Sequence, residues 1–374
     1  MKVIPIFVVD RPFSLKILEG LTNYRNQFGI LSHAFTSANF KEKFKMFPLT
    51  DIKIGDSGIY QGREKDYDSL FREYLRMGVN YGIIKDYYRD PQMTLKSAEE
   101  AIKVYHAQGY YNNFKLVGVA QGRTVEEYVE NYAEQKKMGY EMVAIGGMLD
   151  KIDKHKRLVK VKQEELLIKT LKTIRAEYPK DRLFPLGTFN RYRIGFFKEV
   201  GVWGADYKGW IFKYNVKESH LRNNRLQQVQ HYIETQIFPL IQKNRLLIMS
   251  CSERKKNKTG PAIEVYDGPA YRMVRRYLQN NDGLDVRIIS GKYGLISKDT
   301  IISTYNAKLT KENVLELRKK YASEMKVLSS AYDKKFVYGS KLYRSALMNG
   351  DSLKHTEGKI GQQLSQLKKW LYNE

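Results

Sequence analysis

Short apolar runs recur along the first 210 residues of the chain, separated by polar stretches. Most of these runs are nearly continuously apolar and contain β-branched or aromatic residues, which is typical of strands buried on both faces. The pattern predicts eight strands, at residues 3–9, 33–37, 52–56, 81–85, 116–120, 142–146, 184–189 and 204–207.

Between several of these runs, apolar residues recur at the spacing of amphipathic helices, which predicts helices at 67–77, 97–108, 125–138 and 161–177. Thr94 and Thr124 stand where helix N-caps belong. Strands and helices that alternate in this way, with eight strands, predict a (β/α)8 TIM-like barrel. An open doubly wound sheet is the alternative, and the lack of a GxGxxG segment after the first strand weakens it.

A second pattern begins at Arg245, after a polar stretch at 218–243 that is predicted to be a helical connector. Strands are predicted at 246–249, 286–290 and 336–338, and helices at 270–278 and 311–328. The expected fold class is therefore α/β, with a TIM-like barrel followed by a small α/β domain. We expect the barrel to span residues 1–216, the connector 217–244 and the small basic domain 245–374.

The chain carries a large positive charge, since 65 Lys and Arg against 41 Asp and Glu give +24. Residues 245–374 hold +12 of this excess in about a third of the chain. Such a charge attracts polyanions, and the 28 Tyr, 16 Phe and 3 Trp supply rings that can stack on unpaired bases. The alternative is a set of ordinary solvated lysines, and composition alone leaves both interpretations open.

Composition also excludes several classes of protein. Cys251 is the single cysteine, which excludes a disulfide framework and a multi-cysteine zinc site. Because no His, Cys, Asp and Glu cluster has metal-ligand spacing, we expect no metal. No apolar run approaches the roughly 18 residues of a membrane span, and the first residues lack the cleavage site of a signal peptide. We therefore expect a cytoplasmic protein with no membrane partner.

Polar residues follow the predicted barrel strands at the points where chemistry occurs in a (β/α)8 barrel. Asp56, Asp86 and Gln121 follow the third, fourth and fifth strands. The remaining strands end in or carry Gly146 with Gly147, Leu186 with Gly187, and Asp206. A single Asp after a strand is usually a helix cap or turn former, but several together favour a site. Paired carboxylates suit chemistry at an anomeric carbon, where one attacks C1′ and another moves protons.

The same segments resemble the motifs of tRNA-guanine transglycosylases, in the order in which that family carries them. DSGIYQ at 56–61 resembles the family's DSGG(F/Y)Q, VAQG at 119–122 its VQGG, and AIGG at 144–147 its ALGG. Leu186-Gly187 resembles the Met-Gly of its seventh strand, and GVWGAD at 201–206 its GVDxFD. The matches span most of residues 50–210 and imply the barrel fold and a base-exchange activity.

The resemblance implies a role for each matched residue. Asp206 is expected to be the nucleophile, and Asp56 the general acid/base. The expected base-binding residues are Asp86, Gln121, Gly146, Gly147, Tyr60, Leu186 and Gly187, with Tyr60 stacking on the base. In this chain Ile59 replaces a family glycine, and Arg123 follows the single glycine after Gln121.

The family's zinc subdomain needs three cysteines and a histidine, which this chain cannot supply. Because that subdomain helps to hold tRNA, the resemblance favours the DpdA-like branch, which exchanges guanine for a 7-deazaguanine in DNA. The implied partners are DNA and a free 7-deazaguanine base such as preQ0, with no cofactor. Phages are among the users of this chemistry, so a phage-encoded enzyme in the host cytoplasm is one expectation. The alternatives are a tRNA-guanine transglycosylase without the zinc subdomain and a non-catalytic nucleic-acid-binding protein.

The small domain has polar loops after its predicted strands, with SCSERKK at 250–256 and SGKYGL at 290–295. Basic and small residues at such an edge suit phosphate or nucleic acid binding. We expect phosphate contacts from Arg254, Lys255, Lys256, Lys258 and Lys292. The set resembles a domain found fused to DNA-modifying transglycosylases, and SCSxxK resembles the PCSxxK of archaeosine synthases. A second catalytic site and simple solvated turns stay open as alternatives.

Overall fold

The computed structural model describes residues 3–148, 150–152, 157–160, 163–213, 224–242, 244–281, 283–347 and 353–373. The chain divides into two compact units. The barrel unit comprises Met1–Asn190 and Phe197–Tyr232, and the C-terminal unit comprises Arg191–Phe196 and Ile233–Glu374. Within the described part of the chain, no helix has the length and apolar character needed to cross a membrane.

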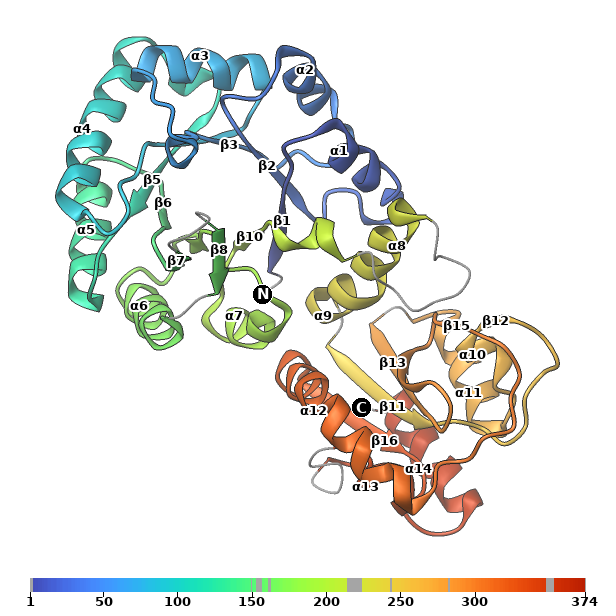
Figure 1. Ribbon diagram of the computed structural model, residues 1–374. Coiled ribbons are helices and arrows are strands. Elements are labelled where there is room, and N and C mark those ends of the chain that lie inside the picture. The colour runs from blue at the N-terminus through green and yellow to red at the C-terminus, as the bar shows by residue number, and fades with distance from the viewer. Residues whose placement is uncertain are drawn as a thin grey trace. The chain divides into compact units, whose positions relative to one another are not determined.

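An eight-stranded, all-parallel sheet forms the centre of the barrel unit (Figure 1). Its order is β10-β1-β2-β3-β4-β5-β6-β9. The strands are β1 Ile4–Val8, β2 Gly29–His33, β3 Lys53–Asp56, β4 Tyr81–Ile83, β5 Lys115–Ala120, β6 Met142–Ile145, β9 Phe184–Pro185 and β10 Gly204–Tyr207. A short antiparallel pair, β7 Asp150–Ile152 and β8 Arg157–Lys160, lies between β6 and β9 in sequence.

Backbone hydrogen bonds between the segments of β9 and β10 bring the sheet close to a closed barrel. Trp203 N–H donates to Leu183 O at 3.0 Å, and Phe189 N–H donates to Asp206 O at 3.2 Å. The strands are apolar because the sheet is buried, as the fully buried Phe7 and Val119 illustrate. The eight predicted strands thus form a nearly closed parallel sheet, which confirms the α/β class and is consistent with a TIM-like barrel.

Helices follow the barrel strands along the chain, and α1 to α6 lie outside the sheet in Figure 1. Helix α3 has the predicted bounds and buries Leu70, Phe71 and Tyr74 of the apolar stripe that predicted it, whereas Leu75 of that stripe is exposed. The helices are α1 Pro12–Glu19, α2 Ala38–Met46, α3 Tyr67–Met77, α4 Pro91–Ala107, α5 Val125–Lys137, α6 Glu164–Glu177, α7 Ile194–Val200 and α8 Arg225–Tyr232.

The second strand lies four residues earlier than predicted, at Gly29–His33 rather than at 33–37. A Cβ at Gly29 would lie 2.6 Å from Ile6 Cδ1, so the strand must start with a glycine, which the apolar pattern does not register. The following residues turn into α2, where the Ser37 side chain accepts the N–H of Phe40 at 3.3 Å. Ser37 is therefore an N-cap and not part of a strand.

Helix α4 also starts earlier than predicted. Its N-cap is Asp90, whose side chain accepts the N–H of Met93 at 2.9 Å. Thr94, predicted as a cap, lies inside the helix, and its hydroxyl donates to Asp90 O at 2.8 Å. Thr124 does cap α5, as predicted, by accepting the N–H of Glu127.

The C-terminal unit is built on a four-stranded sheet of order β14-β13-β11-β16. Strands β13, β11 and β16 are parallel, and β14 is antiparallel to β13. These strands are β11 Arg245–Ser250, β13 Leu284–Ser290, β14 Gly294–Ser297 and β16 Lys334–Tyr338. The short strands β12 Gly260–Pro261 and β15 Ile301–Ile302 pair separately.

The helices of the C-terminal unit are α9 Phe238–Gln242, α10 Ala262–Val265, α11 Pro269–Leu278, α12 Lys311–Ala331, α13 Lys341–Ser345 and α14 Ile360–Asn373. Of these, α10, α11 and α14 contribute to the apolar core that includes Leu247, Val286, Phe336 and Trp370. Residues 217–244, expected to form a connector, are described from 224 to 242 and at 244. There α8 belongs to the barrel unit, while a π-helical turn at Ile233–Ile237 and α9 belong to the C-terminal unit.

Candidate active site

The carboxyl ends of the barrel strands bring the predicted site residues to one edge, which we call the carboxyl rim. Asp56 is the last residue of β3, and Gln121 and Gly146 directly follow β5 and β6. Asp86 lies in the loop after β4, and Asp206 lies within β10. Because the strands are all parallel, these ends share one side of the barrel.

Asp86 lies at the centre of a hydrogen-bonded group on this rim. Its Oδ2 accepts hydrogen bonds from the Tyr60 hydroxyl at 2.9 Å and from Gln121 Nε2 at 2.5 Å. Gln121 Oε1 accepts the N–H of Arg89 at 3.1 Å, which orients the amide. Burial and the charge of Asp56 raise the pKa of Asp86 to about 6, although the bonds from Gln121 and Tyr60 lower it.

Two glycines after β6 allow this group to lie close to the backbone. A Cβ at Gly146 would lie 2.5 Å from Gln121 Nε2, and one at Gly147 would overlap Gln121 Oε1. Gly146 N–H donates to Ala120 O at 3.0 Å, and Gly146 O accepts the Tyr128 hydroxyl at 2.9 Å. The N–H of Gly147 has no acceptor among the described residues. Of this pair, Gly147 therefore offers the backbone donor.

Asp206 is held by the backbone of the segment after β9. Gly187 N–H donates to its Oδ1, and Leu186 N–H donates to Ile145 O at 2.8 Å, so this segment joins β6 to Asp206. The Asp206 side chain is buried. Burial is the main cause that raises the pKa of Asp206 to about 6, and the charge of Asp56 adds to it. The bond from Gly187 and the charge of Lys208 act in the opposite direction.

Asp56 acts electrostatically on both of the other carboxylates. Its Oδ1 accepts the N–H of Gly58 at 2.8 Å. Burial raises the pKa of Asp56, while the Gly58 hydrogen bond and the charges of His33 and Lys208 lower it. Gly58 has φ of 73°, and a Cβ there would lie 2.7 Å from the Phe35 ring, so the turn that presents this N–H requires glycine.

His33 also lies on the carboxyl rim, although no sequence motif points to it. It ends β2, and its Cα pairs in register with that of Asp56 on β3. Burial lowers the pKa of His33, while Asp56 and Asp10 raise it. Its Nδ1 is buried without a hydrogen-bond partner in the described part of the chain. The signal in the sequence was its position at a strand end, which the misplaced second strand concealed.

The three rim carboxylates are coupled through Asp56, whose charge disfavours the charged forms of both Asp86 and Asp206. With pKa values of about 6 for Asp86 and Asp206, both groups can gain or lose a proton near neutral pH. Such groups can serve as nucleophile, proton donor or proton acceptor. The rim therefore combines a backbone-held carboxylate, Asp206, with a carboxylate–amide pair, Asp86 and Gln121.

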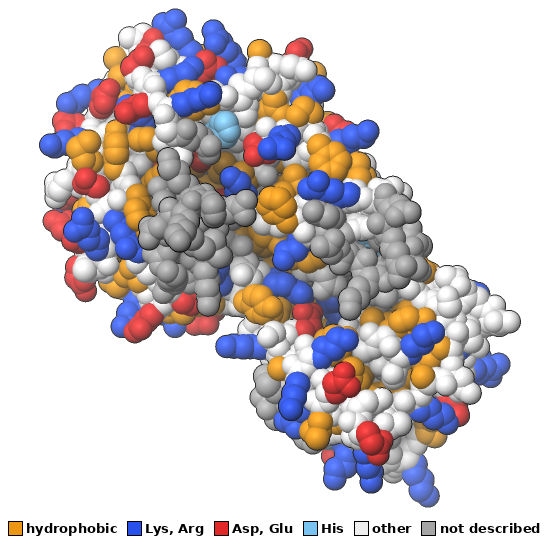
Figure 2. Space-filling model, viewed as in Figure 1, with side chains coloured by type: hydrophobic (Ala, Val, Ile, Leu, Met, Phe, Trp, Pro, Cys, Tyr) orange, Lys and Arg blue, Asp and Glu red, His pale blue; other side chains and the backbone are white. Residues whose placement is uncertain are grey.

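The basic residues predicted to bind nucleic acid lie in two loops of the C-terminal unit, after β11 and after β13. Arg254 Nε lies 3.7 Å from Asp267 Oδ2, and Lys256 Nζ lies 3.9 Å from Glu264 Oε2. Lys258 is exposed, and Lys255 and Lys292 lie near the Tyr305 ring. Figure 2 shows Lys and Arg side chains spread over the visible face of this unit, with a few Asp and Glu among them.

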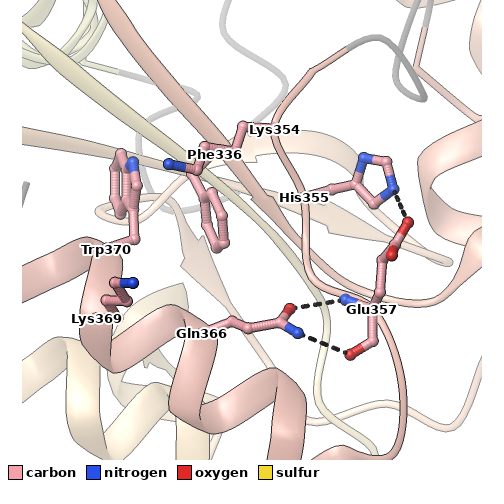
Figure 3. A pocket seen from close by; sticks show the side chains of 7 residues that line it. All are labelled: Phe336, Lys354, His355, Glu357, Gln366, Lys369 and Trp370. Carbon is pink, nitrogen blue, oxygen red and sulfur yellow. Dashed lines mark hydrogen bonds and ion pairs between the residues drawn. The ribbon is translucent and has the colours of Figure 1, made fainter.

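The C-terminal unit also has an open pocket of about 250 Å³, shown in Figure 3. His355 Nε2 lies 3.2 Å from Glu357 Oε1, and the Gln366 amide bonds to the backbone of Glu357 at 2.8 and 3.3 Å. Lys354 and Lys369 complete its charged lining. Among the residues that the structure describes, no group of three or more His, Cys, Asp and Glu could hold a metal ion.

Comparison with known proteins bears on the C-terminal unit alone. No curated protein matches the chain. Residues 246–371, about a third of the chain, match a family model described as a family of unknown function, DUF6884.

Proposed function

We propose that the protein is a DNA guanine transglycosylase, which exchanges a guanine base in DNA for a free 7-deazaguanine base such as preQ0. The observation that carries this proposal is the carboxyl rim. Asp206 is buried and oriented by Gly187 N–H, close enough to Asp56 to feel its charge, and on the same rim as the Asp86–Gln121 pair. The motif resemblance gives the same residues the roles of nucleophile, acid/base and base reader.

In the proposed reaction, a carboxylate oxygen of Asp206 attacks C1′ of the deoxyribose. The bond from C1′ to guanine N9 breaks, its electron pair stays on the base, and the base leaves as protonated Asp56 donates a proton to it. The 7-deazaguanine, losing a proton to Asp56, then attacks C1′ and releases Asp206. Two inversions give net retention at C1′, and no cofactor enters the balance.

Guanine recognition is assigned to Asp86 and Gln121. The guanine edge presents the N1–H and N2–H donors, which a carboxylate accepts, and the O6 acceptor, which a backbone N–H such as that of Gly147 can bond. The bonds from Tyr60 and Gln121 hold the Asp86 carboxylate in one orientation. A site built from such polar groups discriminates strongly against bases that lack the matching edge. The target nucleotide must be extruded or single-stranded to reach the rim.

We assign binding of the DNA phosphate backbone to the positively charged C-terminal unit. Phosphate contacts position a nucleic acid but carry little sequence information, so base choice stays with the barrel. Arg254, Lys256 and Lys258, in the loop after β11, are the proposed contacts.

The test is nucleoside mass spectrometry of DNA incubated with the purified full chain and preQ0. We expect deoxyguanosine to be replaced by the corresponding deazaguanosine with the wild-type protein and not with Asp206→Asn. The parallel reaction uses tRNA, because a transglycosylase that reads the 2′-OH will modify only the ribose substrate. Modification of tRNA alone would overturn the choice of DNA. No exchange in either nucleic acid, by folded protein that binds DNA, would favour a non-catalytic binding protein.

A further inference from the structure

The carboxyl edge of the sheet in the C-terminal unit brings three loops together. Strand β11 lies between β13 and β16, and all three are parallel. Cys251 N–H donates to Ile289 O at 2.8 Å, which places the loop after β11 beside Ser290. A Cβ at Gly339 would lie 3.0 Å from Ser250 Oγ, so the loop after β16 lies next to the end of β11. This edge is where open parallel sheets bind their ligands.

Two lysines from two of these loops meet at one tyrosine ring. Lys255 Nζ lies 4.5 Å, and Lys292 Nζ 5.8 Å, from the centre of the Tyr305 ring. The Tyr305 hydroxyl lies 2.7 Å from Ser290 Oγ and 2.7 Å from the Tyr266 hydroxyl. Ser290 is fully buried, and Tyr305 is mostly buried. The ring is therefore held in place by these hydrogen bonds, and both ammonium groups lie within 5.8 Å of its centre.

Neither ammonium group has a carboxylate within 4.0 Å among the described residues. Three neighbouring basic residues, unlike these two, have acidic partners. Arg254 and Lys256 each lie within 4.0 Å of a carboxylate, and Lys308 pairs with Glu253 at 2.8 Å. Lys255 Nζ donates a hydrogen bond to the backbone oxygen of Glu253 at 3.3 Å. Its electrostatic interaction with the exposed Glu253 carboxylate acts over a distance longer than an ion pair.

We infer that this edge is a phosphate-binding site, in which Lys255 and Lys292 together hold one phosphate group. The inference rests on the phosphate contacts that the proposed function assigns to the C-terminal unit, and it deepens that assignment by naming the two side chains that hold one phosphate group. A phosphate group carries the negative charge that the pair lacks, and its oxygens accept charge-assisted hydrogen bonds from both ammonium groups. The phosphate can belong to a free nucleotide or to a nucleic acid strand.

The pocket in Figure 3 is the competing place for an anion in this unit, since Lys354 and Lys369 line it. Its lining includes the carboxylate of Glu357, which repels phosphate, and the edge at Tyr305 lacks such a group within ion-pair distance of its two lysines. Trp370 O accepts a hydrogen bond from Arg245, the first residue of β11, which places this end of α14 at the opposite edge of the sheet. Lys369 is therefore a matched control.

The experiment uses the full chain carrying Asp206→Asn, so that base exchange does not accompany binding. Isothermal titration calorimetry at low salt measures three probes: inorganic phosphate, deoxyguanosine 5′-monophosphate and a short single-stranded oligodeoxynucleotide. We expect saturable binding of deoxyguanosine 5′-monophosphate or the oligodeoxynucleotide, with inorganic phosphate as a competitor. Lys255→Gln and Lys292→Gln should each weaken binding about tenfold, the effect of removing one charge-assisted hydrogen bond. Lys369→Gln should leave it unchanged, and thermal unfolding should match for all variants.

The tighter of the two nucleotide probes identifies the source of the phosphate. The proposal is wrong if no probe binds, if both lysine variants bind as tightly as their parent, or if Lys369→Gln alone weakens binding. These outcomes are separate from the fate of the proposed function. Loss of base exchange in wild-type protein would contradict the barrel chemistry and leave phosphate binding in the C-terminal unit unaffected.

Discussion

Asp206→Asn should abolish base exchange and at the same time stabilise the folded protein at alkaline pH. Burial raises the pKa of Asp206 from 3.8 to about 6. Each pKa unit corresponds to about 1.4 kcal/mol, so keeping Asp206 ionised in the folded protein at pH 8 costs about 3 kcal/mol. Asparagine has nearly the same shape, and its oxygen can still accept the N–H of Gly187. The hydrogen bond from Gly187 N–H to a neutral amide oxygen is weaker, which offsets part of this difference. The free energy of unfolding of Asp206→Asn should therefore exceed that of wild type by about 1–3 kcal/mol at pH 8.

The stability that Asp206→Asn gains over wild type must increase with pH. Because the pKa of Asp206 is raised in the folded state, the protonated carboxyl favours folding, and this contribution is complete below about pH 4. It is lost as the pH rises through about 6, the folded-state pKa. The difference in the free energy of unfolding between Asp206→Asn and wild type should therefore be near zero at pH 4 and largest at pH 8.

The assay is urea unfolding at pH 4 and pH 8, followed by tryptophan fluorescence, to which Trp203 and Trp210 of the barrel unit contribute together with Trp370. Base exchange is measured on the same preparations and should fall by several orders of magnitude, since the nucleophile is gone. Asp51→Asn serves as the control, because Asp51 is an exposed aspartate of the same unit. An Asp206→Asn protein that is no more stable than wild type at pH 8, or equally stabilised at both pH values, would refute the reasoning.

Three further predictions concern the rim and the basic loops. His33→Gln should move the acidic limb of the pH–rate profile to higher pH, because His33 lowers the pKa of Asp56, and an unmoved limb would contradict this coupling. Gly146→Ala should reduce base exchange at least about tenfold in folded protein, because its Cβ would lie 2.5 Å from Gln121 Nε2. Gly260→Ala is the control in the same nucleoside assay and should have no effect, since nothing lies within 4 Å of its Cβ. Charge reversal at Arg254, Lys256 and Lys258, in the loop after β11, should weaken DNA binding on unrelated sequences. It should also flatten the slope of log affinity against log salt by about 0.7–0.9 for each phosphate that the loop no longer neutralises. The same change at Lys319 and Lys320 on α12 is the control and should alter neither quantity.

The elements of the barrel unit could be predicted largely because their signals are local. Most of the apolar stripe that predicts 67–77 lies on the face that α3 buries, and Thr124 caps α5 through an N–H three residues away. Where a boundary depended on packing, the prediction failed. The glycine that starts β2 is required by Ile6 on the neighbouring strand, and Asp90 takes the cap position expected for Thr94.

The alternation of strands and helices was enough to predict that Asp56, Asp86, Gln121 and Asp206 lie together on one rim. Their chemistry depends on contacts that form only in the folded barrel. The bond between Gln121 and Asp86 joins residues on different strands, and the pairing of His33 with Asp56 depends on the register of β2 and β3. A pKa of about 6 for Asp206 arises from burial, which exists only once the sheet has curved round to bring β9 against β10. Desolvation and long-range contact are properties of the assembled barrel, so no local pattern in the chain could reveal them.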